Sequence, residues 1–437
     1  MTPLTAARAQ MEVSLGFHMI FSAIGMALPV FMMIAEGLHL RTGKPHYLAL
    51  AKKWAKATSL LFAVGAVSGT ALSFELGLLW PRFMEISGGT IGGAFALEGY
   101  AFFIEAIFIG LYLYGWDRLS PRVHWLSGVV VAVSGTASGV LVIAANAWMQ
   151  VPGDFRLEGG KPAVVDPMAP FASPAWIPMA VHTVLAAYVA LGFALAGIYA
   201  LAMLRGRRTS YERSALSIGM CVAAVSAVLQ LVSGHVLAQH VGHHQPVKLA
   251  AMEAHYPTQR HAPIMLGGIV DDEHDVVHGA IEIPSALSFL VGDSFDTEVK
   301  GLADVPRTAR PNVFLCHVAF DVMALSGMLL IGVAAAFYFF VFRRKEPPRL
   351  VLRALVLASP LGFVAIEAGW VVAEAGRQPW TIYNVLLTKD AVTPETGVAM
   401  TFYLFVLLYL GLGTALVVLL RRLGRHAEPA EASPVAV

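Results

Sequence analysis

The stretch PMAVHTVLAAYVALGFALAGIYALAM, residues 178–203, contains no aspartate, glutamate, lysine or arginine. The hydrocarbon layer of a membrane is about 30 Å thick, and a helix needs about 20 apolar residues to cross it. The quoted stretch is long enough to cross. Eight further runs of the same character lie near residues 14–36, 54–79, 94–116, 122–148, 214–238, 313–341, 349–373 and 399–421. The sequence therefore predicts an all-α integral membrane protein with nine transmembrane helices.

The composition supports a membrane protein. Of the 437 residues, 57% are hydrophobic and 14% are charged, and the mean hydropathy is +0.67. A soluble domain carries about 25% charged residues, because polar side chains must cover its surface. A net charge of +1 and only two cysteines argue against a nucleic-acid-binding protein and against a disulfide scaffold. Cys221 and Cys316 are expected to be buried thiols.

Lysine and arginine residues near the ends of the spans indicate which connections face the cytoplasm. They cluster in alternate connections, at Arg41, Lys44, Lys52, Lys53 and Lys56; at Arg118 and Arg122; at Arg205, Arg207, Arg208 and Arg213; at Arg343, Arg344, Lys345 and Arg349; and at Arg421, Arg422 and Arg425. This alternation predicts an outside N-terminus and a cytoplasmic C-terminus. The loops at 80–93, 149–177 and 377–398 are then expected outside.

One polar insertion, residues 239–312, also falls outside in this arrangement. Connections of that length are usually functional. The chain thus divides into helices 1–6 (residues 1–238), the outer loop (239–312), and helices 7–9 with a short cytoplasmic tail (313–437). Residues 427–437 are expected to be disordered.

Five metal-binding side chains lie toward the predicted outer ends of five spans, where ionisable groups are functional candidates because they are costly in lipid. They are His18, Glu98, His182, Met323 and Glu374. Histidine, methionine and carboxylate side chains ligate haem iron or bind metals between helices. A hydrogen-bonded core histidine is the alternative for His182, and apolar filling is the alternative for Met323.

Two further acidic side chains, Glu105 and Asp321, lie in or beside the spans. Glu98 and Glu105 are seven residues apart, on one helix face. They are expected to line an inward proton path, or else to bond neighbouring helices. Asp321 is a candidate too, with a solvated side chain at the aqueous edge as the alternative.

A set of short strings resembles one known family, subunit I of the cytochrome bd quinol oxidases, over essentially the whole chain. The most specific string is Gly376-Arg377-Gln378-Pro379-Trp380, preceded by Gly369-Trp370 and Glu374. The others are Gly115-Trp116-Asp117-Arg118, Ala145-Asn146-Ala147-Trp148-Met149-Gln150, Val181-His182-Thr183 and Gln245-Pro246-Val247-Lys248-Leu249-Ala250-Ala251-Met252-Glu253. In the family the last string belongs to the quinol-binding Q-loop, and its length here resembles the short-loop type.

The resemblance implies five iron ligands. His182 and Met323 match the axial ligands of the low-spin haem b. His18 and Glu98 match residues at the oxygen-reducing haem d, and Glu374 matches the ligand of the high-spin haem b. The division of these last three ligands between the two irons is left open. So is the third haem's chemical type, d or b, and which haem meets oxygen.

The resemblance also implies supporting residues. Trp370, Arg377 and Asn146 are expected beside the haems, where a cation pairs with propionates. Lys248 and Glu253 match quinol-loop residues, and a carboxylate there suits proton acceptance from quinol. Glu105 resembles a glutamate on the proton route from the cytoplasm.

The implied protein is a haem-carrying subunit of a respiratory-chain terminal oxidase in the bacterial inner membrane. It oxidises quinol and reduces dioxygen to water, and it separates charge without a pump. A second, haem-free membrane subunit is implied as its partner, and a small accessory subunit is left open. Ubiquinol and menaquinol are both left open as the donor from the membrane quinol pool.

Two departures from the family pattern are visible. Before Met323 the family usually has Phe-Arg-x-Met, whereas this chain has Phe320-Asp321-Val322-Met323. An anion there is expected to favour oxidised iron and lower its potential. The spacing between Glu98 and Glu105 is one residue shorter than expected, which indicates a local helix irregularity or a moved role.

Three alternative functions compete with the oxidase. One is a divergent bd-like oxidoreductase with another donor or acceptor. A haem-b electron-transfer anchor would explain His182 and Met323 but leave Glu374 without a role. A transporter would use membrane carboxylates, but no inverted repeat accompanies them.

Overall fold

The structure is a computed structural model that describes residues 2–395 and 397–425 of the chain. Within these residues nine spans are long and apolar enough to cross a membrane. They are α1 (Pro3–Thr42), α2 (Pro45–Leu79), α3 (Pro81–Tyr114), α4 (Pro121–Gln150), α6 (Trp176–Leu204), α7 (Ser210–His244), α10 (Val313–Phe342), α11 with α12 (Arg349–Ala358 and Leu361–Ala375), and α14 (Val398–Arg425). The predicted all-α membrane fold is confirmed, whereas the predicted tail at 427–437 lies outside the described residues.

Short elements fill the connections. They are β1 (Leu157–Glu158), β2 (Lys161–Pro162), α5 (Ala169–Ala172), α8 (Pro246–Met252), β3 (Ile264–Leu266), β4 (Ile269–Asp271), β5 (Val276–His278), β6 (Ile281–Ile283), α9 (Ala286–Gly292), the 3-10 helices η1 (Leu302–Asp304) and η2 (Arg307–Ala309), β7 (Trp380–Ile382), β8 (Leu386–Leu387) and α13 (Thr388–Ala391).

The predicted outer loop at 80–93 was wrong, and the predicted eighth span is present but contains a break. The expected outer loop at 80–93 is helical, because α3 already begins at Pro81, a residue suited to the first helical position. The eighth span is broken between α11 and α12, where Ser359 and Pro360 separate the two helices. Proline has no amide hydrogen and fixes its own φ angle, so a helix is easily interrupted before it.

Helix α6 lies at the centre of the bundle and contacts α7, α1, α4, α11 and α12. Small residues allow this close approach, as in other membrane bundles. A Cβ atom added at Gly192 would lie 2.7 Å from the Cβ of Ala223 on α7.

Both cysteines were expected to be buried thiols, and the structure confirms this for only one of them. Cys316 is buried, but Cys221 is exposed because it lies on the outer side of α7.

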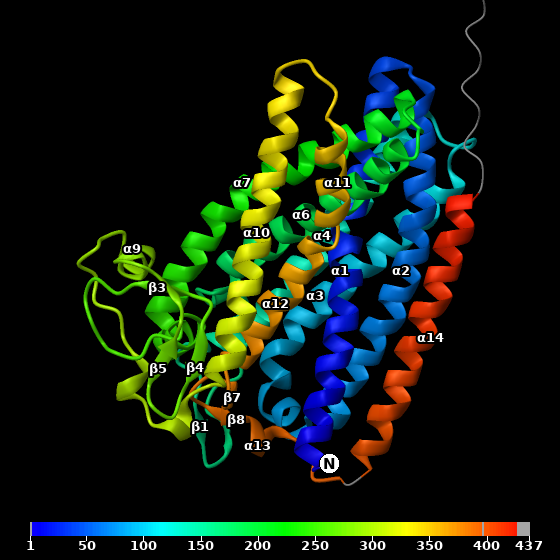
Figure 1. Ribbon diagram of the computed structural model, residues 1–437. Coiled ribbons are helices and arrows are strands. Elements are labelled where there is room, and N and C mark those ends of the chain that lie inside the picture. Colours follow the sequence, from blue (N-terminus) through cyan, green and yellow to red (C-terminus); the bar gives the residue numbers. More distant parts are fainter. Residues whose placement is uncertain (1, 396, 426–437) are drawn as a thin grey trace, which may run out of the picture.

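The two ends of the bundle differ. The N-terminus, β1, β8 and α13 lie at one end (Figure 1). The loop around β7 is held at this end by a hydrogen bond of 3.0 Å from the Tyr383 amide to the Met149 carbonyl oxygen. We call this the loop end. The opposite end has short, basic connections, such as residues 43–44 and 343–348. The alternation of polar loops and basic turns agrees with the predicted arrangement, while the side of the membrane that each end faces stays a prediction.

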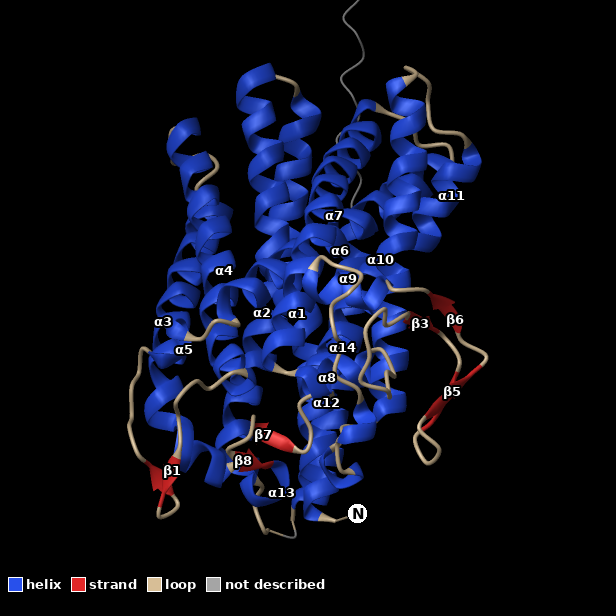
Figure 2. Ribbon diagram, turned by 90° about the vertical axis from the view of Figure 1, so that its left-hand side faces the viewer, coloured by secondary structure: helices blue, strands red, loops and turns tan. Residues whose placement is uncertain are grey.

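Helix α7 continues to His244, so the insertion predicted at 239–312 spans residues 245–312, called the long loop below. It begins with α8 and continues into a bent ribbon, in which β3 pairs with β6 and β4 pairs with β5, both antiparallel. The ribbon extends away from the helices (Figure 2). Its inner part packs on the start of α10 through Val313 and Cys316.

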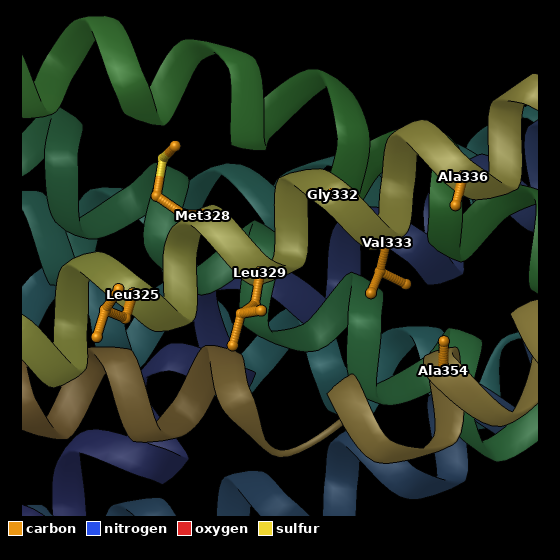
Figure 3. Close-up of a pocket in the computed structure, with 7 residues that line it drawn as sticks. All are labelled: Leu325, Met328, Leu329, Gly332, Val333, Ala336 and Ala354. Atoms are coloured by element: carbon orange, nitrogen blue, oxygen red, sulfur yellow. The ribbon is translucent and has the colours of Figure 1, made fainter.

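The lipid-facing side of the bundle is apolar. A groove of about 370 Å³ between α10 and α11 is lined by Leu325, Met328, Leu329, Gly332, Val333, Ala336 and Ala354 (Figure 3). None of these side chains is polar, and none is a predicted site residue. The groove is therefore a lipid-facing surface, and the candidate chemistry lies elsewhere.

Candidate functional site

Helix α4 contacts two of the predicted ligands. Ser138 donates a hydrogen bond of 2.9 Å from Oγ to Oε1 of Glu98, and Asn146 donates one of 2.7 Å from Nδ2 to Oε1 of Glu374. Ser138 and Asn146 are eight residues apart, which is about 12 Å along a helix. The predicted ligand layer is therefore spread over two levels, with Glu374 nearer the loop end and Glu98 deeper.

His18 lies between α1 and α2. Its Nδ1 is 2.9 Å from Oγ of Ser68, and its Nε2 is 3.0 Å from Oγ of Ser22. A Cβ atom at Gly69 would lie 2.9 Å from the ring. Both ring nitrogens thus contact neutral hydroxyl groups, and the neighbouring helix α2 presents a glycine without a side chain at position 69.

Glu98 and Glu105 lie on the same face of α3, toward α4. Glu105 is buried, and a Cβ atom at Gly135 would lie 2.8 Å from its Oε1. That oxygen has no hydrogen-bond partner among the described residues. Helix α3 is continuously α-helical from Pro81 to Tyr114. The shorter spacing of the two glutamates therefore comes without a break in the helix.

His182 and Met323 contact different helices. His182 on α6 faces α7, with Nδ1 3.1 Å from Oγ of Ser233 and Nε2 3.0 Å from Nε2 of Gln230. Met323 on α10 faces α12, where a Cβ atom at Gly369 would lie 3.0 Å from its sulfur. Helix α12 contacts both α6 and α10, so the two side chains belong to one group of helices.

The loop-end cluster consists of Asn146, Glu374 and Arg377. Arg377 donates from Nη2 to Oε2 of Glu374, while Asn146 occupies the other carboxylate oxygen. The arginine is only 4% exposed, and its Nε and Nη1 find no partner in the part of the chain that the structure describes. Trp370 lies one turn before Glu374 on α12 and is partly buried. The cluster therefore holds a buried cation with unused donors.

Lys248 joins the long loop to this cluster. Its Nζ donates to Oε1 of Gln150 at 2.8 Å and to the carbonyl oxygen of Ala373 at 2.9 Å. Burial, with a smaller contribution from the nearby charge of Arg377, lowers the pKa of Lys248 to about 7. Helix α8 is thus fixed against the ends of α4 and α12, next to Glu374.

Glu253 follows α8 directly and is 1% exposed. Burial raises the pKa of Glu253 to about 8, with a smaller contribution from the charge of Asp321. Its Oε1 has no hydrogen-bond partner within residues 2–395 and 397–425. A buried carboxyl group with a free oxygen and a pKa near neutrality is suited to proton exchange.

The solvated alternative for Asp321 was wrong, because this side chain is 7% exposed and covered by the long loop. Sequence reasoning also missed Ser138, Gln150 and His317, which bond to Glu98, Lys248 and the long loop. Gln150 is the last residue of one of the strings that resemble the family. Its amide in the last turn of an apolar helix is the sequence signal that could have identified it. His317 lies one turn before Asp321, a spacing that indicates a pair.

The side chains present fit haem groups. Imidazole, thioether and carboxylate are haem-iron ligands, and Arg377 has two free donors of the kind that pair with propionates. His18, His182 and Met323 each face a glycine on a neighbouring helix, at Gly69, Gly234 and Gly369. Such positions let backbone approach a ligand closely.

Membrane helices with imidazole, thioether and carboxylate side chains between them define a class of membrane protein suited to electron transfer. A sequence profile described as cytochrome bd terminal oxidase subunit I matches residues 6–428, and the chain belongs to this family. It is 38% identical over 426 residues to a Bacillus subtilis (strain 168) protein that bears the provisional name cytochrome bd menaquinol oxidase subunit I, covering 96% of each chain. It is 30% identical to the cytochrome bd ubiquinol oxidase subunit 1 of that organism, covering 98% of this chain and 95% of the relative.

A solved structure agrees. The bd oxidase from Geobacillus thermodenitrificans matches with a TM-score of 0.92 and 36% identity, covering 97% of this chain and 98% of that one. The chain is therefore part of a quinol:oxygen oxidoreductase and a multi-pass protein of the bacterial inner membrane. Members of the family bind haems and work with a second subunit.

Proposed function

We propose that this chain holds three haems, a low-spin b, a high-spin b and a d, and that it oxidises quinol at the long loop while dioxygen is reduced to water. His182 and Met323 ligate the low-spin haem b. Glu374 ligates the high-spin haem b, and His18 and Glu98 serve the haem d. Trp370, Asn146 and Arg377 line the haem sites.

The observation that carries this proposal is the loop-end cluster. A buried guanidinium is costly unless its donors are used, and Arg377 spends only one nitrogen on Glu374. A propionate is an anion that would accept a charge-assisted hydrogen bond from one of the remaining donors. The cluster is thus suited to a carboxylate-bearing prosthetic group beside Glu374.

The other ligands support the same assignment. When bound, the haems supply one-electron transfer and, at an open iron position, oxygen binding. His182 and Met323 would hold the low-spin haem b, which would supply electron transfer. Ser233 and Gln230 orient the imidazole of His182, and iron bound to one ring nitrogen would replace the contact made there.

Quinol oxidation is assigned to the long loop. Each quinol releases two protons as it gives up its electrons. Glu253 accepts a proton in this proposal, because its carboxyl group is buried beside the loop and titrates near neutrality. Lys248 holds α8 against Gln150 and Ala373 and so sets the distance between the loop and Glu374.

Charge separation follows from the placement of the proton-carrying groups. With the long loop outside, as the basic connections predict, protons from quinol are released outside. Glu105 and Glu98 lie in line along α3 and lead protons from the cytoplasm toward the oxygen site. Electron transfer across this arrangement is proton-motive without a pump.

The proposed organisation has three parts: helices 1–6 (residues 1–244), the long loop as the Q-loop (245–312), and helices 7–9 with a cytoplasmic tail (313–437). A haem-free subunit II is the proposed partner, and a small accessory subunit is a second one. The named relatives use menaquinol in one case and ubiquinol in the other. We propose menaquinol for this chain, because the menaquinol relative is the more similar of the two.

The test is a reduced-minus-oxidised spectrum of the purified complex, with and without carbon monoxide, for Glu374→Ala and Asn146→Ala. Glu374→Ala should lose the signal of one high-spin haem and with it oxygen reduction. Asn146→Ala keeps the carboxylate and should retain that haem with a shifted band. An unchanged spectrum for Glu374→Ala would contradict the proposal and favour a haem-b anchor.

A further inference from the structure

The backbone of Gly267 is held by two side chains of α10. Its amide nitrogen donates to Oδ2 of Asp321 at 2.6 Å, and its carbonyl oxygen lies 3.0 Å from Nε2 of His317. The two side chains are one helical turn apart and face the same side of α10. A single loop residue thus has both of its peptide groups fixed by the helix that carries Met323.

Gly267 forms the bend of the ribbon, between the end of β3 at Leu266 and the start of β4 at Ile269. Gly267 and Gly268 have φ angles of 66° and 91°, in the left-handed region that glycine adopts readily. A Cβ atom at Gly268 would also lie 2.7 Å from Cγ1 of Val277. The bend therefore has a backbone shape that favours glycine, and both peptide groups of Gly267 are bonded to side chains of α10.

His317 makes a second attachment. Its Nδ1 lies 2.9 Å from the carbonyl oxygen of Met252, the last residue of α8. Both of its partners are carbonyl oxygens, so the ring must offer an N–H group at each contact. Oδ2 of Asp321 lies 3.6 Å from Nε2 of the same ring and supplies the matching negative charge. The residue after Met252 is Glu253.

These contacts explain the departure at position 321. An arginine, the usual family residue there, has no acceptor atom and cannot receive the Gly267 amide. A carboxylate receives that amide and pairs with His317 at once. The identity of residue 321 is thus matched to the ribbon bend and to His317 in this chain.

We propose that His317 and Asp321 are positioning residues that fasten the long loop to α10 and thereby hold Glu253 in its place for quinol. The inference rests on the proposed role of this loop in quinol oxidation. The attachment itself does not depend on that role. It makes the loop and the Met323 helix one rigid unit.

The test uses the purified two-subunit complex in lipid nanodiscs. Hydrogen–deuterium exchange is followed for peptides covering residues 264–271 in Asp321→Ala and His317→Leu. Exchange at the bend should rise by about tenfold, since a buried hydrogen bond left unmade shifts opening by roughly that factor. The KM for quinol should rise several-fold more than kcat falls.

Asp293→Asn is the matched control. Asp293 also ties the long loop to a helix, because it bonds to His235 and Gln239 of α7, but it is 63% exposed. It should leave exchange at residues 264–271 unchanged.

Asp321→Asn keeps an acceptor for the Gly267 amide and should give a smaller effect than Asp321→Ala. This difference distinguishes loss of the hydrogen bond from a general folding defect.

Unchanged exchange in Asp321→Ala and in His317→Leu would overturn the inference. Equal increases throughout the chain would overturn it too, because they show general destabilisation. Raised exchange at the bend with an unchanged KM for quinol supports the attachment but contradicts its role in quinol binding. If Glu253→Gln also leaves the KM and kcat for quinol unchanged, the proposed quinol site itself has failed.

Discussion

Two buried polar clusters lie at opposite ends of the bundle and differ in how fully they are bonded. At the end opposite the loops, Glu36 accepts from Tyr112 at 2.6 Å and contacts Nδ1 of His124 at 2.7 Å, while Nε2 of His124 lies 2.9 Å from the Tyr112 carbonyl oxygen. Every polar side-chain atom of these three residues has a partner. In the loop-end cluster, Arg377 leaves two nitrogens without one among the described residues.

The difference separates a structural cluster from a functional one. Buried polar atoms in folded proteins are almost always hydrogen-bonded, so each exception needs an explanation. The Glu36 cluster joins α1, α3 and α4 and needs nothing further. In the proposed function, the unused donors of Arg377 and the free oxygen of Glu253 take a prosthetic group, a substrate or a proton.

The largest effect is expected from Glu36→Ala. The change leaves His124 and Tyr112 buried without their shared acceptor. A buried donor left without its acceptor costs about 1–3 kcal/mol, and two such donors lose theirs here. We therefore expect a marked fall in the thermal unfolding temperature of the complex, with haem spectra unchanged in the protein that remains folded.

Glu85→Ala is the control for Glu36→Ala, because Glu85 pairs with Arg82 on the surface and is 62% exposed. It should change the unfolding temperature little, since exposed pairs contribute about 0–1 kcal/mol. If Glu36→Ala lost haem signals while the unfolding temperature stayed the same, the Glu36 cluster would be functional and the contrast between the two ends would fail.

A smaller effect, on rate rather than stability, is expected from Glu253→Gln. Removing a general base typically lowers the rate by about 10²-fold or more, while the neutral amide keeps the shape of the buried side chain. The raised pKa of Glu253, about 8, sets the pH dependence. Below that pH the carboxyl group is protonated, so quinol oxidation should rise as the pH increases through about 8 in the unchanged protein.

The pH dependence of stability has the opposite sign. A carboxyl group whose pKa is raised on folding binds more protons in the folded state, so its contribution to stability falls as the pH rises from the unfolded value of 4.5 through about 8. Glu253→Gln should flatten both profiles. Steady-state quinol oxidation and thermal unfolding between pH 5 and 9 measure them, and a variant with the rate profile of the unchanged protein excludes Glu253 as the base.

The sequence predicted the nine spans well because membrane helices are set by apolar length, which is a local property. It located α6 and the ends of α4 within a few residues. It missed that 80–93 is helical, because the predicted span begins near residue 94 whereas α3 already begins at Pro81.

The candidate site was predicted only as separate residues. Glu374 and Arg377 are near in sequence, and their pairing follows from helix spacing. The contacts of Asp321 with Gly267 and of Lys248 with Gln150 join segments far apart in the chain. Such contacts depend on tertiary packing, which no local pattern carries, and so the solvated interpretation of Asp321 was wrong.

The smallest effect is expected from Tyr112→Phe, which sharpens the comparison. The ring of Tyr112 packs against Gly128, where an added Cβ atom would lie 2.7 Å from it, and phenylalanine preserves that packing. Only the hydroxyl bond to Glu36 is lost, and Glu36 keeps its contact with His124. A buried hydrogen bond contributes about 1 kcal/mol, so the unfolding temperature should fall slightly and quinol oxidation should keep its rate. Tyr112 lies on the same face of α3 as Glu105, one heptad further along. A large loss of oxidase rate at unchanged stability would therefore extend the proton path to the Glu36 cluster and would remove the distinction between the two ends.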